Sequence, residues 1–350
     1  MAYGPAHPPR TGGCDGSSPR QFYTATLEQT DQMWRGSRPE QEFGNQFAAR
    51  NPYGGPGARA SEAMRRGAVS MGWLEALVLG IVQGLTEFLP ISSSAHQAIV
   101  GQFFGGEDPG SAFTAITQLG TESAVIIFFR KDIWLIIKSW ALSLTGKIPR
   151  NDPEARLGWL VIIGSIPIVV LGLIFQDAID HGLRNLWTTA AMLAGFGIII
   201  GVIDQLAANS RPMESMTWRH GLFLGLVQSL ALIPGVSRSG ATIAGGLALG
   251  YQRVAAAKFS FLLAIPAVVG SGLFKLADIS SDPVPPAWGP IALATVISFV
   301  IGYAVIAWLL RYVSTHTFLP FVIYRIALAA GVAVLLITGI LTPLPPTSAG

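Results

Sequence analysis

The sequence predicts an all-α polytopic membrane protein of two inverted repeats, each a re-entrant helical hairpin plus three transmembrane helices. Three observations predict this class. Hydrophobic residues make up 51% of the chain and charged residues only 12%, against roughly 25% charged residues in a soluble domain. Several apolar runs approach the ~20 residues that a helix needs to cross a bilayer. Two proline-broken polar segments also repeat 145 positions apart, as at Gln83 and Gln228, and such duplication indicates a buried site between repeats.

Residues 1–70 differ in composition from everything after them. They are rich in Gly, Pro, Ser, Arg and Gln and lack apolar periodicity, so we expect a disordered polar extension. No apolar segment precedes Trp73, which argues against a signal peptide. Met71 opens the hydrophobic part, so a start at Met71 and a real but dispensable extension both stay open. Residues 71–344 then form the membrane domain, and 345–350 a short C-terminal tail.

Composition also excludes several function classes. The net charge of +3 is too small and too dispersed to indicate a nucleic-acid partner. Cys14 is the only cysteine, which excludes a disulfide within the chain, a four-cysteine zinc site and paired-cysteine redox chemistry. The lipid bilayer is therefore the first partner that the sequence predicts.

Two kinds of membrane segment follow along the chain. Full spans are predicted at about 112–130, 156–176, 185–207, 256–276, 288–312 and 318–341. The repeated segments, 72–104 and 217–250, each have an apolar arm, a proline-broken polar centre and a second short arm. A broken backbone at membrane depth is tolerated only inside protein or beside a watery cavity, so both are predicted to be re-entrant hairpins. Three spans separate them, which inverts the second half relative to the first.

The distribution of basic residues supports this plan. The linkers predicted to be cytoplasmic hold Arg130, Lys131, Lys138, Lys147, Arg150, Arg156, Arg211, Arg219, Arg253, Lys258 and Arg311. The opposite linkers hold Arg184 and Lys275 beside Glu107, Asp108, Asp177, Asp180, Asp278 and Asp282. This bias fits the positive-inside rule, although Arg65 and Arg66 fall on the wrong side. Residues 132–145 are predicted to be an amphipathic helix at the cytoplasmic interface.

The first break carries a carboxylate and a hydroxyl cluster. Glu87 lies one helical turn beyond Gln83, so both side chains share a face of a helix that is expected to end at Pro90. Three serines and a histidine follow at once, namely Ser92, Ser93, Ser94 and His96. An ionised carboxylate at membrane depth is costly and normally has a partner or a function. The alternative is a neutral Glu87, or one that caps a neighbouring helix.

The second break, residues 234–242, has the composition of an anion-binding loop. Its glycines allow backbone N–H groups to converge, and a helix is expected to begin near Ser239. Arg238 supplies a planar, permanently charged group that suits phosphate oxygens. Ser237, Ser239 and Thr242 add hydroxyl donors. The alternative is a close-packing loop in which Arg238 only neutralises Glu87.

Together the two breaks supply the groups that phosphoryl transfer needs. Glu87 is a candidate base or metal ligand, His96 a proton shuttle, and Arg238 a clamp for the oxyanion. Candidate nucleophiles are Ser92, Ser93 and Ser94. A carboxylate that faces a diphosphate also predicts a divalent cation, Mg²⁺ or Ca²⁺.

Two long motifs in this order resemble the signatures of a known family. Residues 83–90, Gln-Gly-Leu-Thr-Glu-Phe-Leu-Pro, with the serines and His96 that follow, are similar to the first signature of the bacitracin-resistance family of undecaprenyl-diphosphate phosphatases. Residues 234–242, Pro-Gly-Val-Ser-Arg-Ser-Gly-Ala-Thr, resemble the second. The resemblance spans about residues 71–341.

The resemblance implies a membrane hydrolase that converts undecaprenyl diphosphate to the monophosphate at the outer face of the bacterial cytoplasmic membrane. This step recycles the lipid carrier of peptidoglycan synthesis, and bacitracin acts indirectly through the substrate. The implied catalytic residues are Glu87, Ser93, His96 and Arg238, and the implied substrate contacts are Gln83, Ser92, Ser94, Ser237, Ser239 and Thr242. The motif allows Glu or Gln at Gln83, so here Glu87 has no carboxylate partner within that pair.

Several alternatives stay open at this point. Ser93 activated by His96 would form a phosphoserine, which we favour slightly, and water activated by His96 or Glu87 would attack directly. A polyprenyl-phosphate carrier could use the same inverted repeats, and a pure lipid-binding protein would bind without turnover. A carrier needs no nucleophile, so Ser93→Ala separates it from an enzyme. Both a monomer and a homo-oligomer fit the sequence.

Other polar residues carry weaker signals. Glu122 lies inside a span and faces either the same cavity or a neighbouring helix. Asp177, Asp180 and His181 are expected in a solvated loop. Snorkelling toward the interface is expected to explain Asp204, Arg311 and Arg325, and close helix packing to explain Gly245 and Gly246.

Overall fold

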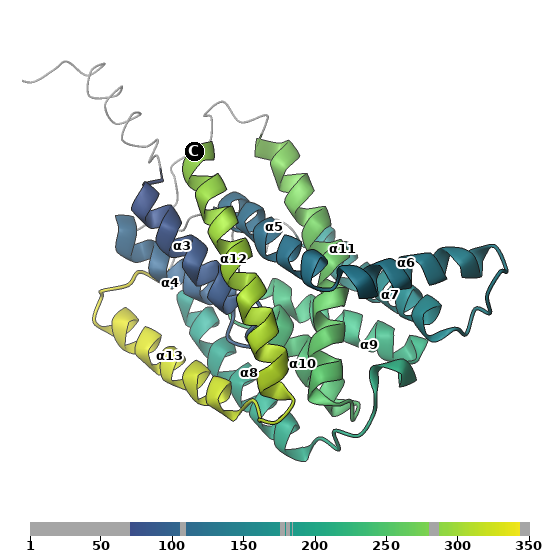
Figure 1. Cartoon of the computed structure of the whole chain (residues 1–350). Coiled ribbons are helices and arrows are strands. Elements are labelled where there is room, and N and C mark those ends of the chain that lie inside the picture. Colours follow the sequence, from purple (N-terminus) through teal and green to yellow (C-terminus); the bar gives the residue numbers. More distant parts are fainter. Residues whose placement is uncertain are drawn as a thin grey trace, which may run out of the picture. The chain divides into compact units, whose positions relative to one another are not determined.

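The computed structural model describes residues 71–105, 110–175, 179, 183, 185–279 and 287–343 (Figure 1). All of them belong to the compact unit Gly67–Gly350. Several predictions lie outside the described residues, namely those on 1–70, Glu107, Asp108, Asp177, Asp180, His181, Arg184, Asp282 and 345–350.

The described part of the chain is helical, as predicted. Its helices are α3 (Trp73–Thr86), α4 (Ser93–Gly105), α5 (Gly110–Phe128), α6 (Arg130–Leu144), α7 (Pro153–Ile174), α8 (Leu186–Leu206), η2 (Met213–Ser215), α9 (Trp218–Ser229), η3 (Leu230–Leu232), α10 (Arg238–Ala248), α11 (Arg253–Ile279), α12 (Trp288–Val313) and α13 (Leu319–Ile337). Five of these, α7, α8, α11, α12 and α13, are long and apolar enough to cross a membrane. The prediction of a multi-pass membrane protein is therefore confirmed.

The predicted span at 112–130 is the exception among the six. It corresponds to α5, whose described apolar stretch, Phe113–Phe128, is shorter than the five long helices. Helix α5 ends at Phe128. Helix α6 begins at Arg130, the first residue of the charged sequence Arg130-Lys131-Asp132. Helix α6 matches the predicted amphipathic segment, with the indole of Trp134 exposed.

Helix starts follow local capping chemistry. The side chain of Asp152 accepts hydrogen bonds from two backbone N–H groups of α7, and Pro153 occupies its first turn. Asn185 caps α8 and Thr217 caps α9 in the same way. These caps set where the chain re-enters a helix after each linker.

Each of the two segments predicted to be a hairpin contains two short helices around a break. Helices α3 and α4 flank the first break, and α9 and α10 the second. Helix α3 ends at Thr86 with Glu87 as its C-cap, so the expectation that it continues to Pro90 is wrong. Ser92 and Ser237, 145 positions apart, both adopt the left-handed region, with φ of 73° and 74°. Non-glycine residues rarely do so, which marks the same strained turn in each hairpin.

The first arm of each hairpin packs closely on a long helix from the other half of the chain. Helix α3 packs on α12 and α9 on α7, while α5 lies between α11 and α12 and α13 lies on α8. A Cβ at Gly80 would lie 2.7 Å from the carbonyl oxygen of Ala294, and one at Gly225 would lie 2.7 Å from the Cα of Gly164. Repeated glycines thus allow both crossings.

We expect Gly225→Ala to destabilise the protein by about 1–3 kcal/mol, because the new methyl group meets backbone that cannot move away. Thermal unfolding in detergent measures this. Gly195→Ala is the matched control, since a Cβ there meets no atom within 4 Å, and alanine favours the helix. Equal melting temperatures for the two variants would contradict the close crossing.

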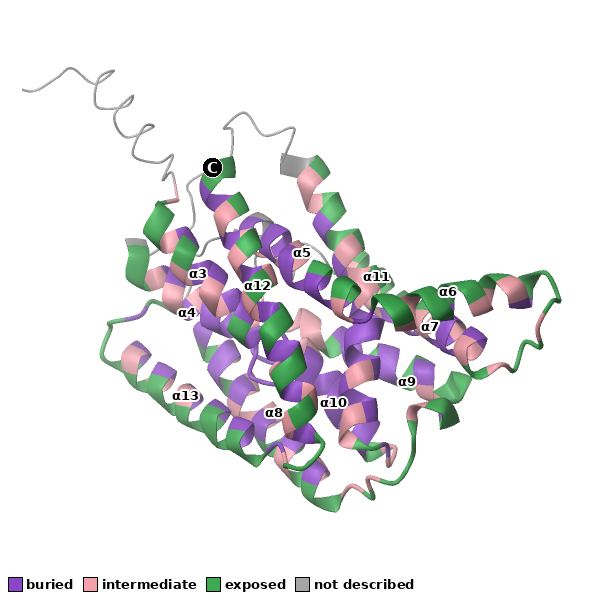
Figure 2. Cartoon of the chain, in the orientation of Figure 1, coloured by how far each residue is buried: buried purple, intermediate pink, exposed green. Residues whose placement is uncertain are grey.

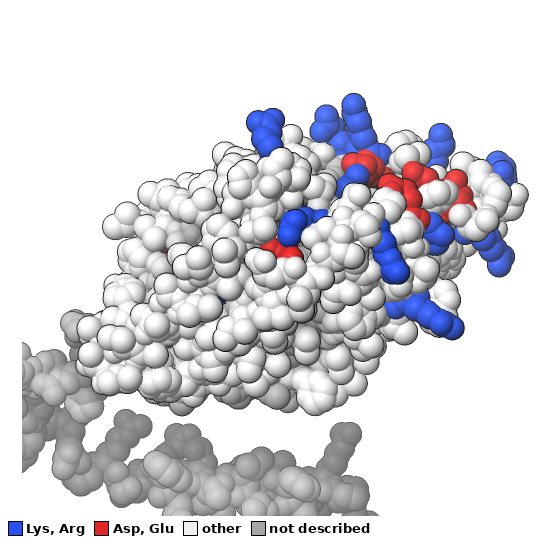
Figure 3. All heavy atoms as spheres, turned by 90° about the horizontal axis from the view of Figure 1, so that it is seen from below, with Lys and Arg blue, Asp and Glu red and all other residues white. Residues whose placement is uncertain are grey.

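The helices differ in how deeply they are buried. Helix α10 is buried along almost its whole length, whereas the long helices expose one apolar face (Figure 2). Figure 3 shows a face that is mostly free of charge, with Lys, Arg, Asp and Glu gathered toward the end at which α6 and its following linker lie. Lys131, Lys138, Lys147 and Arg150 are exposed in that region.

Snorkelling does not explain Asp204 or Arg325, and that expectation is wrong for both. Asp204 is 2% exposed. It accepts a hydrogen bond of 2.6 Å from Nε of Arg253 and one of 2.8 Å from the backbone N–H of Phe318, which ties α8 to α11 and to the start of α13. Arg325 is fully buried. Arg311 is exposed and remains compatible with snorkelling.

Candidate active site

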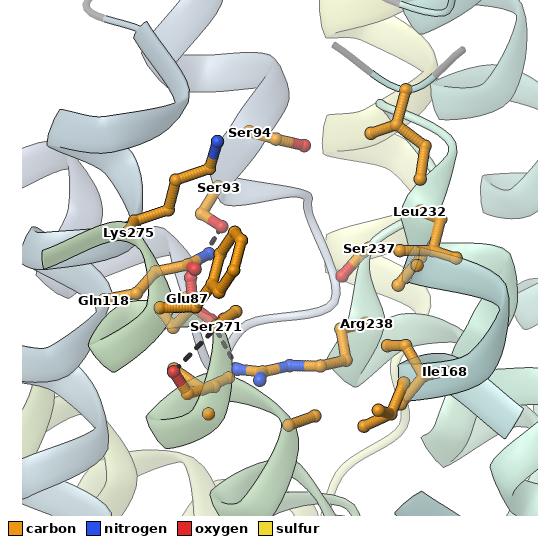
Figure 4. Close-up of a pocket in the computed structure, with 18 of the residues that line it drawn as sticks. Glu87, Ser93, Ser94, Gln118, Ile168, Leu232, Ser237, Arg238, Ser271 and Lys275 are labelled. Carbon is orange, nitrogen blue, oxygen red and sulfur yellow. Dashed lines mark hydrogen bonds and ion pairs between the residues drawn. The ribbon is translucent and has the colours of Figure 1, made fainter. Parts of the chain in front are cut away.

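The two breaks meet at a cavity of about 530 Å³ (Figure 4). Residues of the breaks that line it are Glu87, Ser92, Ser93, Ser94, Ala231, Leu232, Ser237 and Arg238. Other lining residues are Gln118, Ile168, Val169, Gly172, Leu173, Ile179, Ala267, Val268, Gly270, Ser271, Phe274 and Lys275. The cavity therefore has a polar head built from both breaks and an apolar wall built mainly from α7 and α11.

Glu87, Ser93 and Arg238 form one hydrogen-bonded cluster at the polar head, where Figure 4 shows them pointing toward one another. Ser93 donates from Oγ to Oε2 of Glu87 at 2.7 Å, and Arg238 donates from Nη2 to Oε1 at 2.5 Å. Gln83 also donates from Nε2 to Oε2 of Glu87 at 2.7 Å, as its predicted place on the same helix face requires. Glu87 is thus held by three donors. Its pairing with Arg238 agrees with the alternative interpretation given above, in which Arg238 neutralises Glu87.

The first residues of two helices line the cavity. Helix α4 begins at Ser93 and α10 at Arg238, one residue before the expected start. Each is preceded by a strained serine whose Oγ lies 3.2 Å from the Oγ of the serine two residues later. First-turn N–H groups and the positive ends of the helix dipoles favour an anion at this position.

Glu122 belongs to the same charge cluster, although it is not among the cavity-lining residues. It is 1% exposed and its Oε2 lies 3.9 Å from Nη2 of Arg238. Among the described residues, neither carboxylate oxygen has a hydrogen-bond partner. Glu122 thus neither lines the cavity nor bonds to a neighbouring helix, as the two predictions had it, but lies beside Arg238.

The ring nitrogens of His96 bond to groups other than Ser93. Its Nδ1 donates to the carbonyl oxygen of Ser92 at 2.7 Å, and its Nε2 lies 2.7 Å from the hydroxyl of Tyr324. The two rings are also stacked. His96 therefore supports the turn at Ser92 in this arrangement, while Glu87 is the group positioned to take the proton of Ser93. The catalytic role of His96 stays a prediction.

Three of the predicted substrate contacts have structural partners instead of lining the cavity. Ser239 donates to the carbonyl oxygen of Leu89 at 3.0 Å, which ties the second break to the first. Thr242 donates to the carbonyl oxygen of Arg238 at 2.7 Å and also contacts Ser260. Gln83 is fully buried. Ser92, Ser94 and Ser237 do line the cavity.

Arg325 holds both breaks, and the sequence analysis missed this role. Its guanidinium donates to the carbonyl oxygen of Pro90 at 2.9 Å and to that of Gly235 at 2.8 Å. Further bonds reach the carbonyl oxygens of Val236, Leu193 and Met192. The sequence signal that could have indicated it is an arginine inside an otherwise apolar segment, where a charged side chain normally has partners.

The apolar wall and the additional polar lining residues were also missed. Ile168 and Leu173 of α7 and Val268 and Phe274 of α11 lie in ordinary membrane helices. Nothing in an apolar helix marks which of its faces borders a cavity. Lys275, assigned from sequence only to an outer linker, lines the cavity as well.

The oxygen donors of two carboxyl groups at the site are of the kind that a hard divalent cation prefers. Glu87 and Glu122 offer carboxylate oxygens close to one guanidinium, and both oxygens of Glu122 lack hydrogen-bond partners. Within the described ranges, no group of three or more His, Cys, Asp or Glu side chains could hold a metal. Carboxylate oxygens are ligands that Mg²⁺ and Ca²⁺ prefer, so the chemistry of these two side chains is compatible with the predicted divalent cation, which stays a prediction.

Comparisons with known proteins agree with these features. Residues 76–331 match the family model described as "Bacitracin resistance protein BacA". The chain is 58% identical over 273 residues to an undecaprenyl-diphosphatase of Kineococcus radiotolerans, covering 78% of this chain and 97% of that protein. It is 56% identical over 276 residues to an undecaprenyl-diphosphatase of Micrococcus luteus, covering 78% and 100% of the two chains. An undecaprenyl-diphosphatase 2 of Streptomyces coelicolor is 56% identical over 293 residues, covering 80% and 100%. Since the family match includes both breaks and most of the membrane unit, the chain belongs to the bacitracin resistance protein BacA family.

Proposed function

We propose that this protein hydrolyses undecaprenyl diphosphate to undecaprenyl phosphate and inorganic phosphate, which recycles the lipid carrier of peptidoglycan synthesis and confers bacitracin resistance. The observation that carries the proposal is the bonded cluster of Ser93, Glu87 and Arg238 at the head of an apolar-walled cavity. The names of the family and of its relatives support the same substrate.

The cavity suits an amphipathic diphosphate. The two helix N-termini, the hydroxyls of Ser94 and Ser237 and the guanidinium of Arg238 are donors for the phosphate oxygens. The wall that includes Leu173, Val268 and Phe274 is apolar and suits the isoprenoid chain.

The chemistry follows from the Ser93–Glu87 hydrogen bond. Ser93 attacks the terminal phosphorus, its proton passes to the carboxylate of Glu87, and the phosphoanhydride bond to the lipid monophosphate breaks. Glu87 passes this proton to the departing lipid phosphate and is ionised again. Water then attacks the phosphoserine, and Glu87 takes one proton from the water and returns it to Oγ of Ser93 as the Ser93–phosphorus bond breaks and inorganic phosphate leaves. Arg238 stabilises the charge on the transferring group. A bound divalent cation, held by Glu87, would supply further charge neutralisation of the diphosphate.

We place the chain in the bacterial cytoplasmic membrane as two inverted repeats, with the active site toward the outer side. The exchanged packing of α3 on α12 and α9 on α7 supports a two-fold relation between the halves. The matching strained serines, Ser92 and Ser237, support it as well. The exposed basic residues of α6 and its linker support a cytoplasmic position for that end.

The proposal is tested by phosphate release from undecaprenyl diphosphate with the full chain in detergent. Arg238→Ala is expected to lower kcat by roughly 10²–10³-fold, because a preorganised charge at the transferring group is lost. Arg238→Lys should recover only part of it, since an ammonium cannot make the two-pronged contact. A chelator should abolish the wild-type activity, and Mg²⁺ should restore it.

Arg219→Ala is the control, because this arginine is exposed on α9, where its guanidinium stacks on Trp218 outside the cavity. It should leave phosphate release unchanged. A wild-type protein that binds the lipid diphosphate in this assay without releasing phosphate would overturn the hydrolase proposal and favour the carrier.

A further inference from the structure

A second buried carboxylate lies at the site without an assigned role. Glu122 is almost completely buried on α5, yet neither of its oxygens has a hydrogen-bond partner among the residues that the structure describes. Buried carboxylates are normally paired or hydrogen-bonded, because desolvating an unpaired one is costly. In the described part of the chain, no side chain or backbone group therefore gives Glu122 the hydrogen bond that a buried carboxyl group normally has.

Its position on α5 directs it to the polar head. Gln118, one helical turn earlier on the same face, lines the cavity. The Oε2 of Glu122 lies 3.9 Å from Nη2 of Arg238, the same nitrogen that donates to Glu87. Both carboxylates thus approach one guanidinium nitrogen from different helices.

The cluster of Glu87, Glu122 and Arg238 holds more acidic groups than basic ones. Glu87 and Glu122 bring two carboxyl groups, and Arg238 brings one guanidinium. Gln83, one helical turn before Glu87, is an amide that donates to Glu87 and adds no charge. The second carboxyl group of this site therefore comes from Glu122 on α5 and not from α3.

We propose that Glu122 and Glu87 together hold the divalent cation of this site, with α5 supplying the second carboxylate that Gln83 does not provide. The inference rests on the proposed function for the use of that cation in diphosphate hydrolysis. A cation bound to both carboxylates takes over the neutralisation that Arg238 provides in the structure. The guanidinium then becomes available to the phosphate oxygens.

The test measures Mn²⁺ binding by electron paramagnetic resonance on the full chain in detergent, with Mn²⁺ alone as the probe. Glu122→Gln keeps the shape of the side chain and removes its charge, and we expect it to weaken Mn²⁺ at least roughly tenfold. The double variant Gln83→Glu/Glu122→Gln moves the carboxylate to α3 and should recover most of the affinity. Thermal unfolding of each variant in the same detergent verifies that it is folded.

Two further variants keep the test decisive. Glu75→Gln is the matched control, because Glu75 lies in the first turn of α3, away from the cavity-lining residues, and accepts a hydrogen bond from the backbone N–H of Gly72. It should bind Mn²⁺ like wild type. Gln83→Glu alone adds a carboxylate beside Glu87 and should tighten Mn²⁺, which gives a readout even where Glu122→Gln fails to fold.

The outcomes separate this inference from the proposed function. Unchanged Mn²⁺ affinity in folded Glu122→Gln, or no Mn²⁺ binding by wild type, would overturn the role of Glu122 as a ligand, because it then acts as a neutral packing group. Phosphate release by wild type, measured on the same preparation, reports on the hydrolase itself. Metal-dependent release with unchanged affinity in Glu122→Gln would keep the function and reject only this ligand.

Discussion

Substituting Arg325 by methionine is expected to abolish phosphate release and to lower the melting temperature more than any other single change at the site. The guanidinium donates to carbonyl oxygens on both breaks, at Pro90, Gly235 and Val236. It also donates to those of Met192 and Leu193 on α8. A buried carbonyl that loses its partner costs about 1–3 kcal/mol, and methionine replaces none of these donors.

The catalytic effect follows from the position of these carbonyls. Pro90 precedes the serines of the first break, and Gly235 precedes the Ser237–Arg238 turn. Without the common donor, the two helix N-termini are no longer fixed relative to each other, and misplacement by about 1 Å costs on the order of 10²-fold in rate. Arg325→Lys should lower the melting temperature less than Arg325→Met does, because one ammonium still reaches some of the carbonyls. Its loss of phosphate release should be larger than its loss of thermal stability, since it reaches fewer of them than the guanidinium.

Thermal unfolding and phosphate release on the same detergent preparations measure this prediction. Arg311→Met is the matched control, since Arg311 is an exposed arginine in the last turn of α12. It should change neither quantity. A folded Arg325→Met protein with wild-type kcat would show that the breaks keep their geometry without the shared donor.

Local patterns predicted the parts of the fold that depend on near neighbours in sequence. The apolar runs predicted the five long helices, and the repeated prolines predicted both breaks. The separation of Gln83 and Glu87 by four residues predicted their contact, which is a hydrogen bond across one helical turn. Each of these features follows from helix periodicity or from the loss of a backbone donor at proline.

Contacts across the sequence could not be predicted in the same way. Arg325 was assigned to an interface because it lies near a span end, whereas the packing of α13 on α8 buries it completely. His96 was paired with Ser93 by proximity in sequence, but the start of α4 directs its ring to Tyr324. Glu122 joins the site because the packing of α5 brings its Oε2 to 3.9 Å from Nη2 of Arg238, which lies 116 positions later in the second break. Such partners depend on how helices cross, which a single sequence does not record.

Ser93→Ala is expected to lower kcat for phosphate release by roughly 10³-fold or more while the protein still binds the lipid diphosphate. Ser93 is the hydroxyl that donates to Glu87, at 2.7 Å, and that also lines the cavity. Ser94→Ala is the matched control, because Ser94 lines the same cavity but bonds to Ser92 instead of to the carboxylate. It should lose far less activity.

The same variants decide between the two chemical routes. If Ser93 is the nucleophile, acid quenching of wild type during turnover traps a phosphoserine that Ser93→Ala cannot form. Glu87→Gln should then lose activity to a similar degree, since an amide cannot take the proton, and combining both substitutions should add little because the residues act as one unit. Near-wild-type activity in Ser93→Ala, with activity still lost in Glu87→Gln, would instead mean that Glu87 activates water directly, since the carboxylate is the one group that both routes require.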